Sequence, residues 1–352
     1  MLRAFSIVSD FLRSQASTIK DVARQAGVSL QTVSRVVNQH PSVKPTTRNR
    51  VLEAIEDLRY QPNSAARSLV NRRSTTLGLI SYGTTFYGPA SMTESLEQAA
   101  RSRGYALSLT HLGDLSMTQI TEAVQTLRRQ QVDGLMLLAP LVGIELNHLK
   151  ALCQGLPTVL LEVQELLAQD SIAITAMDQY SGAREAANHL IELGHKQLVL
   201  LRGPPNWAAT DQRAKGWLSA LRDAKLQPVA NLEGDWSARS GHEAVTRLLQ
   251  SKTPFTGLLA ANDQMALGAL LALHEAGIRV PSDVSVVGFD NVPESAYFIP
   301  PLTTVYQDFA TLGHRSLEQL LEMIEMPDSA SRLQVVATQF VVRQSTARAI
   351  PR

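Results

Sequence analysis

Short apolar segments alternate with helical stretches from residue 75 to the end of this chain. The candidate strands are "TLGLIS", "ALSLTHL", "GLMLLAP", "TVLLEV", "SIAIT", "QLVLLRG", "TGLLAAN" and "DVSVVGFD". Stretches between them, such as "SLEQAARSRG" and "REAANHLIELG", have helical periodicity. Strands that are almost continuously apolar are buried on both faces, as in a parallel sheet covered by helices. The number of strands predicts two such α/β units side by side.

The first part of the chain differs from the rest in charge. Residues 1–73 contain 12 Lys and Arg against 5 Asp and Glu, a net +7, so the remaining 21 and 27 give −6. A basic segment on an acidic body predicts a polyanionic partner for that segment alone. With 352 residues, 44% of them hydrophobic, the chain is long enough for two or three domains with cores of their own.

The basic segment has the pattern of two helices joined by a tight turn. In "TIKDVARQAGVSLQTVSRVVNQ", Thr18 and Asp21 can form a capping box. Gly27 is placed to end the first helix in a left-handed conformation, and Ser29 to cap the second. The valines of "TVSRVV" point inward, which leaves the polar side chains beside them facing outward.

These outward-facing side chains are suited to DNA. Gln31 matches adenine, Arg35 matches guanine and Leu30 matches the methyl group of thymine, while Thr32 and Ser34 can hold phosphate oxygens. The alternative is a small helical bundle with a solvated polar face. The turn, the caps and the basic charge together favour DNA binding.

A third helix and a linker are expected next. Pro45 suits the first position of "PTTRNRVLEAIEDLRY", whose apolar face is expected to contain Val51, Leu52, Ile55 and Leu58. The basic, small-residue stretch "QPNSAARSLVNRRS" is too short for a stable isolated helix and is expected to be a linker or hinge.

The chain resembles the lactose-repressor (LacI) family of bacterial transcription regulators. The resemblance is carried by "DVARQAGVSLQTVSRVVN", "TRNRVLEAIEDLRYQPNSAARSL", "HLIELGHKQLVLLRGP", "EGDWSARSG", "AANDQMALGALLAL", "DVSVVGFD" and "IPPLTTVYQDFATLG". It implies a small all-α helix-turn-helix domain and a two-lobed α/β body of the periplasmic-binding-protein type, with a ligand cleft between the lobes. The implied divisions are an extension over 1–16, the helix-turn-helix domain over 17–62, a hinge over 63–74 and the body over 75–352. The first lobe is expected at about 75–174 and 306–336, and the second at about 175–305 and 337–345.

The resemblance also implies roles at the DNA. Leu30, Gln31 and Arg35 match base-reading positions, and residues 63–69 match a hinge that becomes helical on operator DNA and inserts Leu69 into the minor groove. The full set of expected DNA contacts is Thr18, Ser29, Leu30, Gln31, Thr32, Ser34, Arg35, Asn38, Lys44, Thr47, Asn63, Ala66 and Leu69. Two positions depart from the family pattern. Leu30 replaces an aromatic residue of the member that gives the family its name, and Lys44 replaces a serine that caps the third helix in many members.

Polar side chains stand where ligands bind in open α/β sheets, at the carboxyl ends of strands. Glu162, Asn262 and Asp290 end candidate strands, Arg213 is placed to open a helix, and Trp236 lies in "EGDWSA". Such a set can bind a sugar, because the polar groups hold hydroxyls and the indole stacks on the ring. Each residue alone is as typical of a helix cap or a solvated loop.

By resemblance, Arg213, Trp236, Asn262 and Asp290 match inducer-binding positions, and Glu162 stands in place of an aspartate. The full set of expected ligand contacts is Phe86, Pro89, Met92, Glu162, Arg213, Trp236, Asn262, Asp290, Gln307 and Phe309. This match favours a galactoside-like sugar. Structural roles are expected for four other residues: a helix cap for Asp263, packing for Trp207 and Trp217, and a turn for His195.

The expected function is a cytoplasmic, operator-binding repressor of a sugar-utilisation operon, released by a small sugar. The alternatives are a different sugar, or a corepressor such as a purine that strengthens DNA binding. A homodimer formed through the body is expected, because no leucine-heptad tail of the kind used for tetramers follows "FVVRQSTARAIPR". The opening "MLRAFSIVSDFLRSQAS" is expected to be a mobile or helical extension rather than an export signal, because Asp10 and Arg13 interrupt its apolar run.

Other classes are disfavoured. The chain has no GxGxxG, GxxxxGK[ST], GxSxG or HExxH motif, so an enzyme is not expected, although Glu162 and Asp290 could imitate the carboxylate pair of a glycosidase. A sugar-transport protein would not need the basic segment. The single cysteine, Cys153, is expected to be buried, and neither a metal site, a cofactor nor a transmembrane helix is expected.

Overall fold

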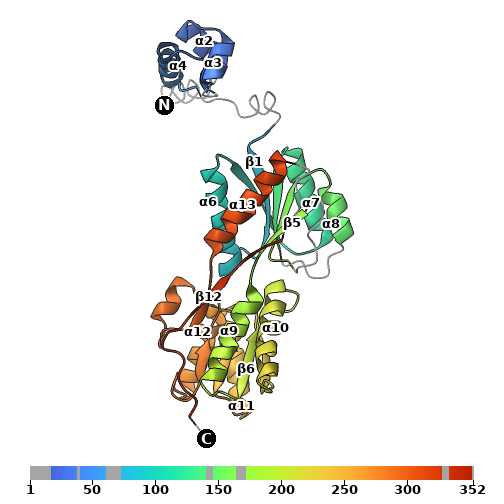
Figure 1. Cartoon of the computed structure of the whole chain (residues 1–352), viewed down its shortest axis with the longest axis vertical. Coiled ribbons are helices and arrows are strands. Elements are labelled where there is room, and N and C mark those ends of the chain that lie inside the picture. Colours follow the sequence, from blue (N-terminus) through green and yellow to red (C-terminus); the bar gives the residue numbers. More distant parts are fainter. Residues whose placement is uncertain are drawn as a thin grey trace, which may run out of the picture. The chain divides into compact units, whose positions relative to one another are not determined.

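The computed structural model describes residues 17–37, 40–60, 73–139, 146–163, 172–326 and 333–350. They belong to two compact units, Met1–Ser74 and Thr75–Arg352, which we call the head and the body. Figure 1 shows both units.

The head consists of three short helices around a small aliphatic core. The helices are α2 (Ile19–Ala26), α3 (Leu30–Val37) and α4 (Pro45–Asp57). Val22, Val33 and Val51 are completely buried between them. The expected face of α4 is wrong at one position, because Leu52 is 49% exposed and Ala54 takes its place in the core.

The expected caps of the head are present. The Asp21 carboxylate accepts hydrogen bonds from the backbone N–H and the hydroxyl of Thr18, at 3.0 and 2.7 Å. Gly27 has φ 62° and ends α2, and the Ser29 hydroxyl accepts from the backbone N–H of Thr32 at 3.2 Å. Lys44, before α4, makes no side-chain cap bond. The tight turn thus fixes α3 against α2.

The first lobe of the body is built on a six-stranded sheet of order β11-β5-β4-β3-β1-β2, in which every pairing is parallel. Its strands are β1 (Thr76–Tyr82), β2 (Ala106–Leu112), β3 (Gly134–Leu138), β4 (Thr158–Leu161), β5 (Ile172–Met177) and β11 (Leu333–Val336). Its helices are α6 (Tyr87–Ser102), α7 (Met117–Arg129), α8 (Leu146–Cys153) and α13 (Phe309–Glu325). Helices α6 and α13 cover one face of this sheet, and α7 and α8 cover the other, with a hydrophobic core on each face. Because the strands are buried on both faces, their residues are almost continuously apolar. Cys153 is buried in the second of these cores.

The second lobe is built on a four-stranded parallel sheet of order β7-β6-β8-β9. Its strands are β6 (Leu198–Arg202), β7 (Ala230–Glu233), β8 (Gly257–Ala260) and β9 (Ser285–Val287). Its helices are α9 (Gln179–Glu192), α10 (Ala208–Asp223), α11 (Ala238–Gln250), α12 (Asp263–Glu275) and the 3-10 helix η2 (Pro293–Tyr297). Trp217, fully buried here, has the packing role expected of it.

The described chain passes between the lobes at three points. It leaves the first lobe from β5 into α9, returns from β10 (Thr304–Gln307) into α13, and leaves again from β11 into β12 (Thr338–Val341). Strands β10 and β12 pair antiparallel. Figure 1 shows this ribbon at the junction of the two lobes.

The predicted fold class is confirmed, and each of the eight candidate strands coincides with a strand. Strands β7, β10, β11 and β12 were not predicted. Polar residues interrupt their sequences, ANLE, TVYQ, LQVV and TQFV, so no continuous apolar run marks them. Within the described ranges, no helix has the length and apolar character needed to cross a bilayer.

Gly268 lets α11 and α12 pack in close contact. A Cβ at this position would lie 1.8 Å from the carbonyl oxygen of Ala238 and 2.6 Å from the backbone nitrogen of His242. We therefore expect Gly268→Ala to lower the free energy of unfolding of the body by about 1–3 kcal/mol in urea denaturation. Gly113→Ala is the control, because the atoms nearest its Cβ belong to the Gln119 side chain at 3.5 Å. Equal stability of the two variants would contradict this account of the packing.

Candidate functional site

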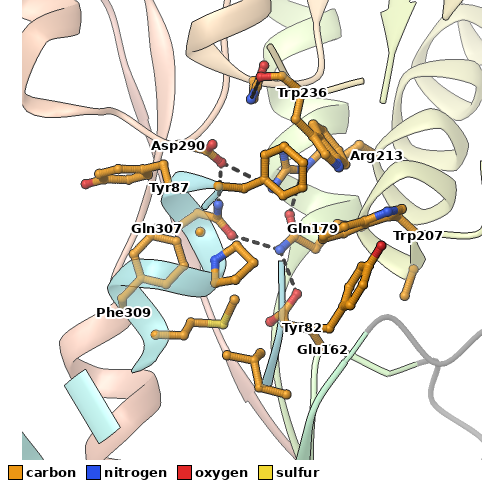
Figure 2. A pocket seen from close by; sticks show the side chains of 18 of the residues that line it. Tyr82, Tyr87, Glu162, Gln179, Trp207, Arg213, Trp236, Asp290, Gln307 and Phe309 are labelled. Atoms are coloured by element: carbon orange, nitrogen blue, oxygen red, sulfur yellow. Dashed lines mark hydrogen bonds and ion pairs between the residues drawn. The ribbon is translucent and has the colours of Figure 1, made fainter. Parts of the chain in front are cut away.

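A cavity lies between the two lobes of the body, with about 630 Å³ of unfilled space including its open mouth. All ten residues expected to contact a ligand line it: Phe86, Pro89, Met92, Glu162, Arg213, Trp236, Asn262, Asp290, Gln307 and Phe309. Figure 2 labels six of these ten residues around the cavity: Glu162, Arg213, Trp236, Asp290, Gln307 and Phe309.

Strand ends and helix starts position these side chains. Glu162 directly follows β4, and Asp290 lies just beyond β9, so both stand at the carboxyl edge of a parallel sheet. Phe86 caps α6, and Pro89 and Met92 follow at intervals of three residues, which puts them on one side of the helix. Arg213 does not open α10 as expected, because the helix already begins at Ala208.

A continuous set of polar side chains, which we call the polar column, crosses the cavity. It consists of Glu162, Gln179, Gln307, Arg213 and Asp290. The amide nitrogen of Gln179 donates to Glu162 Oε2 at 2.9 Å and to Gln307 Oε1 at 2.8 Å, and its oxygen accepts from Arg213 Nε at 2.8 Å. Gln179 thus connects a carboxylate of the first lobe to a guanidinium of the second.

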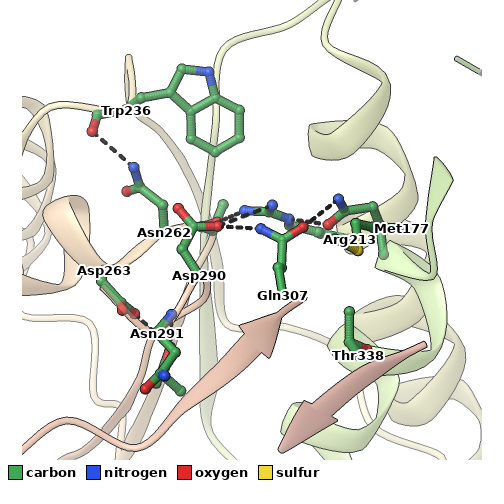
Figure 3. Close-up of polar contacts among 12 residues, drawn as sticks. Met177, Arg213, Trp236, Asn262, Asp263, Asp290, Asn291, Gln307 and Thr338 are labelled. Atoms are coloured by element: carbon green, nitrogen blue, oxygen red, sulfur yellow. Dashed lines mark hydrogen bonds and ion pairs between the residues drawn. The ribbon is translucent and has the colours of Figure 1, made fainter. Parts of the chain in front are cut away.

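Each nitrogen of the buried Arg213 guanidinium has a hydrogen-bond partner. It donates to the carbonyl oxygen of Ala261 and to Asp290 Oδ1, the latter at 3.3 Å. Its guanidinium carbon lies 3.8 Å from the centre of the Phe289 ring. Gln307 Nε2 also donates to Asp290 Oδ1, at 2.6 Å. Figure 3 shows Asp290 held between Arg213 and Gln307.

The carboxyl groups here resist ionisation. Burial raises the pKa of Asp290 to about 6, and Arg213 and Gln307 oppose that shift. Removal from water also raises the pKa of Glu162, although part of its surface reaches the cavity. Burial, with the nearby charge of Asp290, raises the pKa of Asp263 to about 8. The site therefore favours protonated or strongly hydrogen-bonded carboxyl groups.

Asn262 has a structural role in addition to the expected ligand contact, and Asp263 has a structural role other than the expected cap. Asn262 caps α12, because its side-chain oxygen accepts from the backbone N–H of Met265 at 2.9 Å. Its amide nitrogen donates to the carbonyl oxygen of Trp236 at 3.0 Å. The expectation that Asp263 caps α12 is wrong. Asp263 accepts from the backbone N–H of Val292 at 2.8 Å and from the Thr304 hydroxyl at 2.6 Å, which ties α12 to β10.

Aromatic rings form much of the cavity wall. The Trp207 ring lies 5.9 Å from Tyr82, 5.7 Å from Phe86 and 5.6 Å from Trp236, measured between ring centres. Tyr87 lies 6.0 Å from Phe309 in an edge-to-face arrangement. Trp207 does pack, as expected, but at the cavity wall and against rings of the opposite lobe.

Three lining residues that matter to this geometry, Tyr82, Gln179 and Trp207, were not expected there. Tyr82 is the last residue of β1, and Gln179 follows β5 after one residue. The rule that polar and aromatic groups at strand ends point to a site would have found both. His195, expected to serve a turn, is buried and contacts the Thr256 hydroxyl and the Ala347 carbonyl oxygen at 3.0 Å each.

On the head, the expected base-reading residues lie on the outer side of α3. Leu30 is 45% exposed, and Gln31 and Arg35 are exposed beside it. Of the other expected DNA contacts, Thr18, Ser29 and Lys44 are exposed and Thr32, Ser34 and Thr47 partly buried. Thr18, Ser29 and Thr32 also serve the helix caps. Asn38, Asn63, Ala66 and Leu69 lie outside the described residues. The part of the chain that is described holds no group of His, Cys, Asp or Glu suited to a metal ion.

Comparison with known proteins finds a family match for the head and another for the body. Residues 18–63 match the family described as bacterial regulatory proteins, lacI family, and residues 187–346 match a periplasmic binding protein-like domain. The lactose operon repressor of Escherichia coli strain K12 is 38% identical over 306 residues, which are 87% of this chain and 84% of that protein. The HTH-type transcriptional repressor PurR of Haemophilus influenzae is 35% identical over 339 residues, 94% of this chain and 98% of that protein.

A solved structure agrees with both matches. The crystal structure of the Lac repressor dimer bound to operator and the anti-inducer ONPF has a TM-score of 0.88 at 35% identity, covering 95% of this chain and 100% of that one. These relatives are transcriptional repressors and not enzymes, in agreement with the absence of catalytic motifs.

The raised pKa of Asp263 predicts a pH-dependent stability. A carboxyl group with a pKa of about 8 in the folded chain and 3.8 as its ordinary value holds its proton more tightly when folded. Its contribution to stability is therefore complete below about pH 4 and is lost as the pH rises through about 8. Asp263→Asn keeps a neutral group that can bond Val292 and Thr304, so we expect its melting temperature to fall less between pH 5 and 8.5 than that of the unaltered protein.

Asp235→Asn is the control, because Asp235 is exposed and hydrogen bonds from Ser237 hold the pKa of its carboxyl below the usual value. It should leave the slope of melting temperature against pH unchanged in this range. An unchanged slope in Asp263→Asn would contradict the assignment.

Proposed function

The chain belongs to the lacI family of bacterial regulatory proteins, and from this premise we propose that it represses a sugar-utilisation operon and is released from its operator by a small, galactoside-like sugar. It is a DNA-binding transcriptional repressor, and its site of action is chromosomal DNA in the cytoplasm.

The head supplies the DNA contacts. α3 has the dimensions that a major groove admits, and Gln31 and Arg35 can form paired hydrogen bonds with base edges. We assign base reading to Leu30, Gln31 and Arg35, and phosphate contacts to Thr18, Thr32, Ser34, Lys44 and Thr47. The net charge of +7 on residues 1–73 supports DNA binding by the head rather than by the body.

One observation carries the sugar proposal: an indole, a guanidinium, a carboxyl and amides converge in one cavity. Trp236 lies 5.6 Å from the Arg213 guanidinium, which contacts Asp290 and Gln179. A pyranose offers an apolar face to the indole and hydroxyls that both donate and accept to the polar column. We assign the ligand contacts to the ten expected lining residues.

A corepressor is the second candidate. It is favoured by the 35% identity to a repressor named PurR over 94% of this chain. A flat purine could lie against the same aromatic rings, and Gln179 could pair with its edge. In that case the ligand would strengthen DNA binding.

The proposed mechanism follows from linkage. A sugar shifts the repressor only if it binds one arrangement of the lobes more tightly than the other. The lobes are connected by the polar column, so replacing its bonds with bonds to sugar hydroxyls changes the relative stability of the two arrangements. By reciprocity, operator weakens sugar binding by the same factor.

We propose that the repressor acts as a homodimer. The similar Lac repressor structure is a dimer on its operator. On the second lobe, Tyr297 and Ile299 are 85% and 94% exposed, which is unusual for large apolar side chains and suits a surface that a second copy covers. Two heads would then read a pseudo-palindromic operator.

The ligand proposal predicts a measurable coupling. After an operator is selected from randomised duplexes, we expect methyl β-galactoside to weaken operator binding by roughly 5–150-fold, the usual range of allosteric coupling, in a fluorescence anisotropy titration. Hypoxanthine and guanine should have no effect. Tighter operator binding with a purine, and no response to any sugar, would establish the corepressor instead.

The division of DNA contacts predicts two different mutant profiles. Gln31→Ala should cost about 1–3 kcal/mol of discrimination at one operator position, because a bidentate base contact is lost. Lys44→Ala should weaken binding to all sequences alike and lower the salt slope by about 1, because one phosphate contact is lost. Both profiles come from anisotropy titrations against a panel of single-base operator variants. Identical profiles would show that base reading and phosphate contact are wrongly assigned.

A further inference from the structure

His40 is an exposed residue of the head that follows α3 and precedes α4. Its backbone N–H donates to the carbonyl oxygen of Arg35, in the last turn of α3, at 2.8 Å. Its own carbonyl oxygen accepts a hydrogen bond from Arg48 Nη2, on α4, at 2.6 Å. Two helices of the head therefore fix the backbone of His40.

Ser42 fixes the imidazole ring of His40. The backbone N–H of Ser42 donates to Nδ1 at 3.3 Å, and the Ser42 hydroxyl oxygen lies 2.8 Å from the same nitrogen. This hydroxyl can donate to Nδ1 of a neutral ring or accept from Nδ1–H of a protonated ring, so it holds the ring in both states. Among the described residues Nε2 has no partner, so its N–H is available to a group outside the protein.

The surface around His40 is basic. Arg48 contacts the residue directly, and Arg35 and Lys44 flank it in the sequence. The carboxylates in the described part of the head are those of Asp21, Glu53, Glu56 and Asp57. None of these four has a hydrogen bond or an ion pair with the His40 ring; Asp21 pairs with Arg24, and Asp57 accepts from Gln25. A basic surface with a free N–H donor suits a phosphate group.

The position of His40 after α3 favours a phosphate over a base edge. In helix-turn-helix proteins, residues at the start of the second helix contact base edges, and in this chain these are Leu30 and Gln31. His40 follows the opposite end of that helix. A single N–H donor also lacks the paired geometry that distinguishes one base pair from another.

We propose that His40 is a further DNA contact of the head, in which the Nε2–H of its imidazolium donates to a phosphate oxygen. Imidazole changes its charge between pH 5 and 8, whereas the charges of Arg35 and Lys44 stay constant there. A phosphate binds imidazolium more tightly than neutral imidazole. By reciprocity, the head takes up a proton when it binds DNA, and its affinity for DNA rises as the pH falls. The inference rests on DNA binding by the head and is independent of the proposed sugar.

Fluorescence anisotropy titrations of the full-length protein at pH 6 and pH 8 test the proposal, with a selected operator and with a duplex of unrelated sequence. The ratio of the affinities at pH 6 and pH 8 should be about fivefold larger in the unaltered protein than in His40→Gln, for each head that binds. The salt slope of the unaltered protein should also steepen by about 0.9 per head between pH 8 and pH 6, and that of His40→Gln should not. Both duplexes should behave alike, because every duplex carries phosphates.

His40→Arg gives the opposite profile. Its charge is permanent, so it should bind at pH 8 about as tightly as the unaltered protein binds at pH 6. His148→Gln is the matched control, because His148 is exposed on α8 of the body, and it should retain the pH ratio and the salt slopes of the unaltered protein. The buried carboxyl groups of Asp263 and Asp290 are present in every variant, so their titration cancels in the comparison.

Two outcomes would overturn the proposal. The first is an equal pH ratio and an equal salt slope in the unaltered protein and in His40→Gln. The second is a His40-dependent pH effect on the operator that is absent from the unrelated duplex, because it would show a contact with a base and not with a phosphate.

Discussion

The buried guanidinium of Arg213 is the interaction on which the arrangement of the cavity depends. Removing an arginine from water is expensive unless each of its donors is satisfied. Here its partners are a glutamine at the start of α9, a carbonyl oxygen after β8 and a carboxylate beyond β9, and an aromatic ring covers one face. These partners come from separate parts of the second lobe and from the junction of the lobes. The position of Arg213 therefore fixes Gln179, and Gln179 fixes both Glu162 of the first lobe and Gln307 at the end of β10.

The polar column also limits the free energy that a ligand can gain from hydrogen bonds in the cavity. Its members already bond to one another, so a ligand gains only the difference between the bonds it makes and the bonds it breaks. A ligand with hydroxyls at the wrong positions leaves buried groups unpaired, which costs more than a missing contact at a solvated surface. For the proposed sugar, selectivity would therefore come from hydroxyls that match the existing hydrogen bonds, and the aromatic rings would supply affinity that depends little on direction.

The elements that could be predicted from the sequence are those marked by a pattern of neighbouring residues, such as an apolar run or a helix cap. Buried parallel strands are continuously apolar, so eight of the strands were found, and Gly27 and Ser29 marked the turn of the head through backbone conformation and capping. Strands β10 and β12 escaped because polar residues interrupt their four-residue sequences, TVYQ and TQFV, so neither has a continuous apolar run. The ten expected lining residues depended on family resemblance as much as on strand ends. Trp207 escaped because its importance comes from contacts across the two lobes, with residues such as Tyr82 that are distant in sequence.

The route from the cavity to the head is short in covalent terms. Strand β1 begins at Thr76, two residues after the head ends, and finishes at Tyr82 in the cavity wall. It lies inside the first-lobe sheet, paired with β2 on one side and β3 on the other. Its start is held by reciprocal bonds, with Thr75 N–H donating to Asp133 Oδ2 and Asp133 N–H donating to the Thr76 carbonyl oxygen, both at 2.8 Å. A strand fixed along its length moves with its sheet as one body. A change in the angle between the lobes therefore reaches the linker through the backbone of β1, and no relay of side-chain rearrangements through the first lobe is needed to carry it.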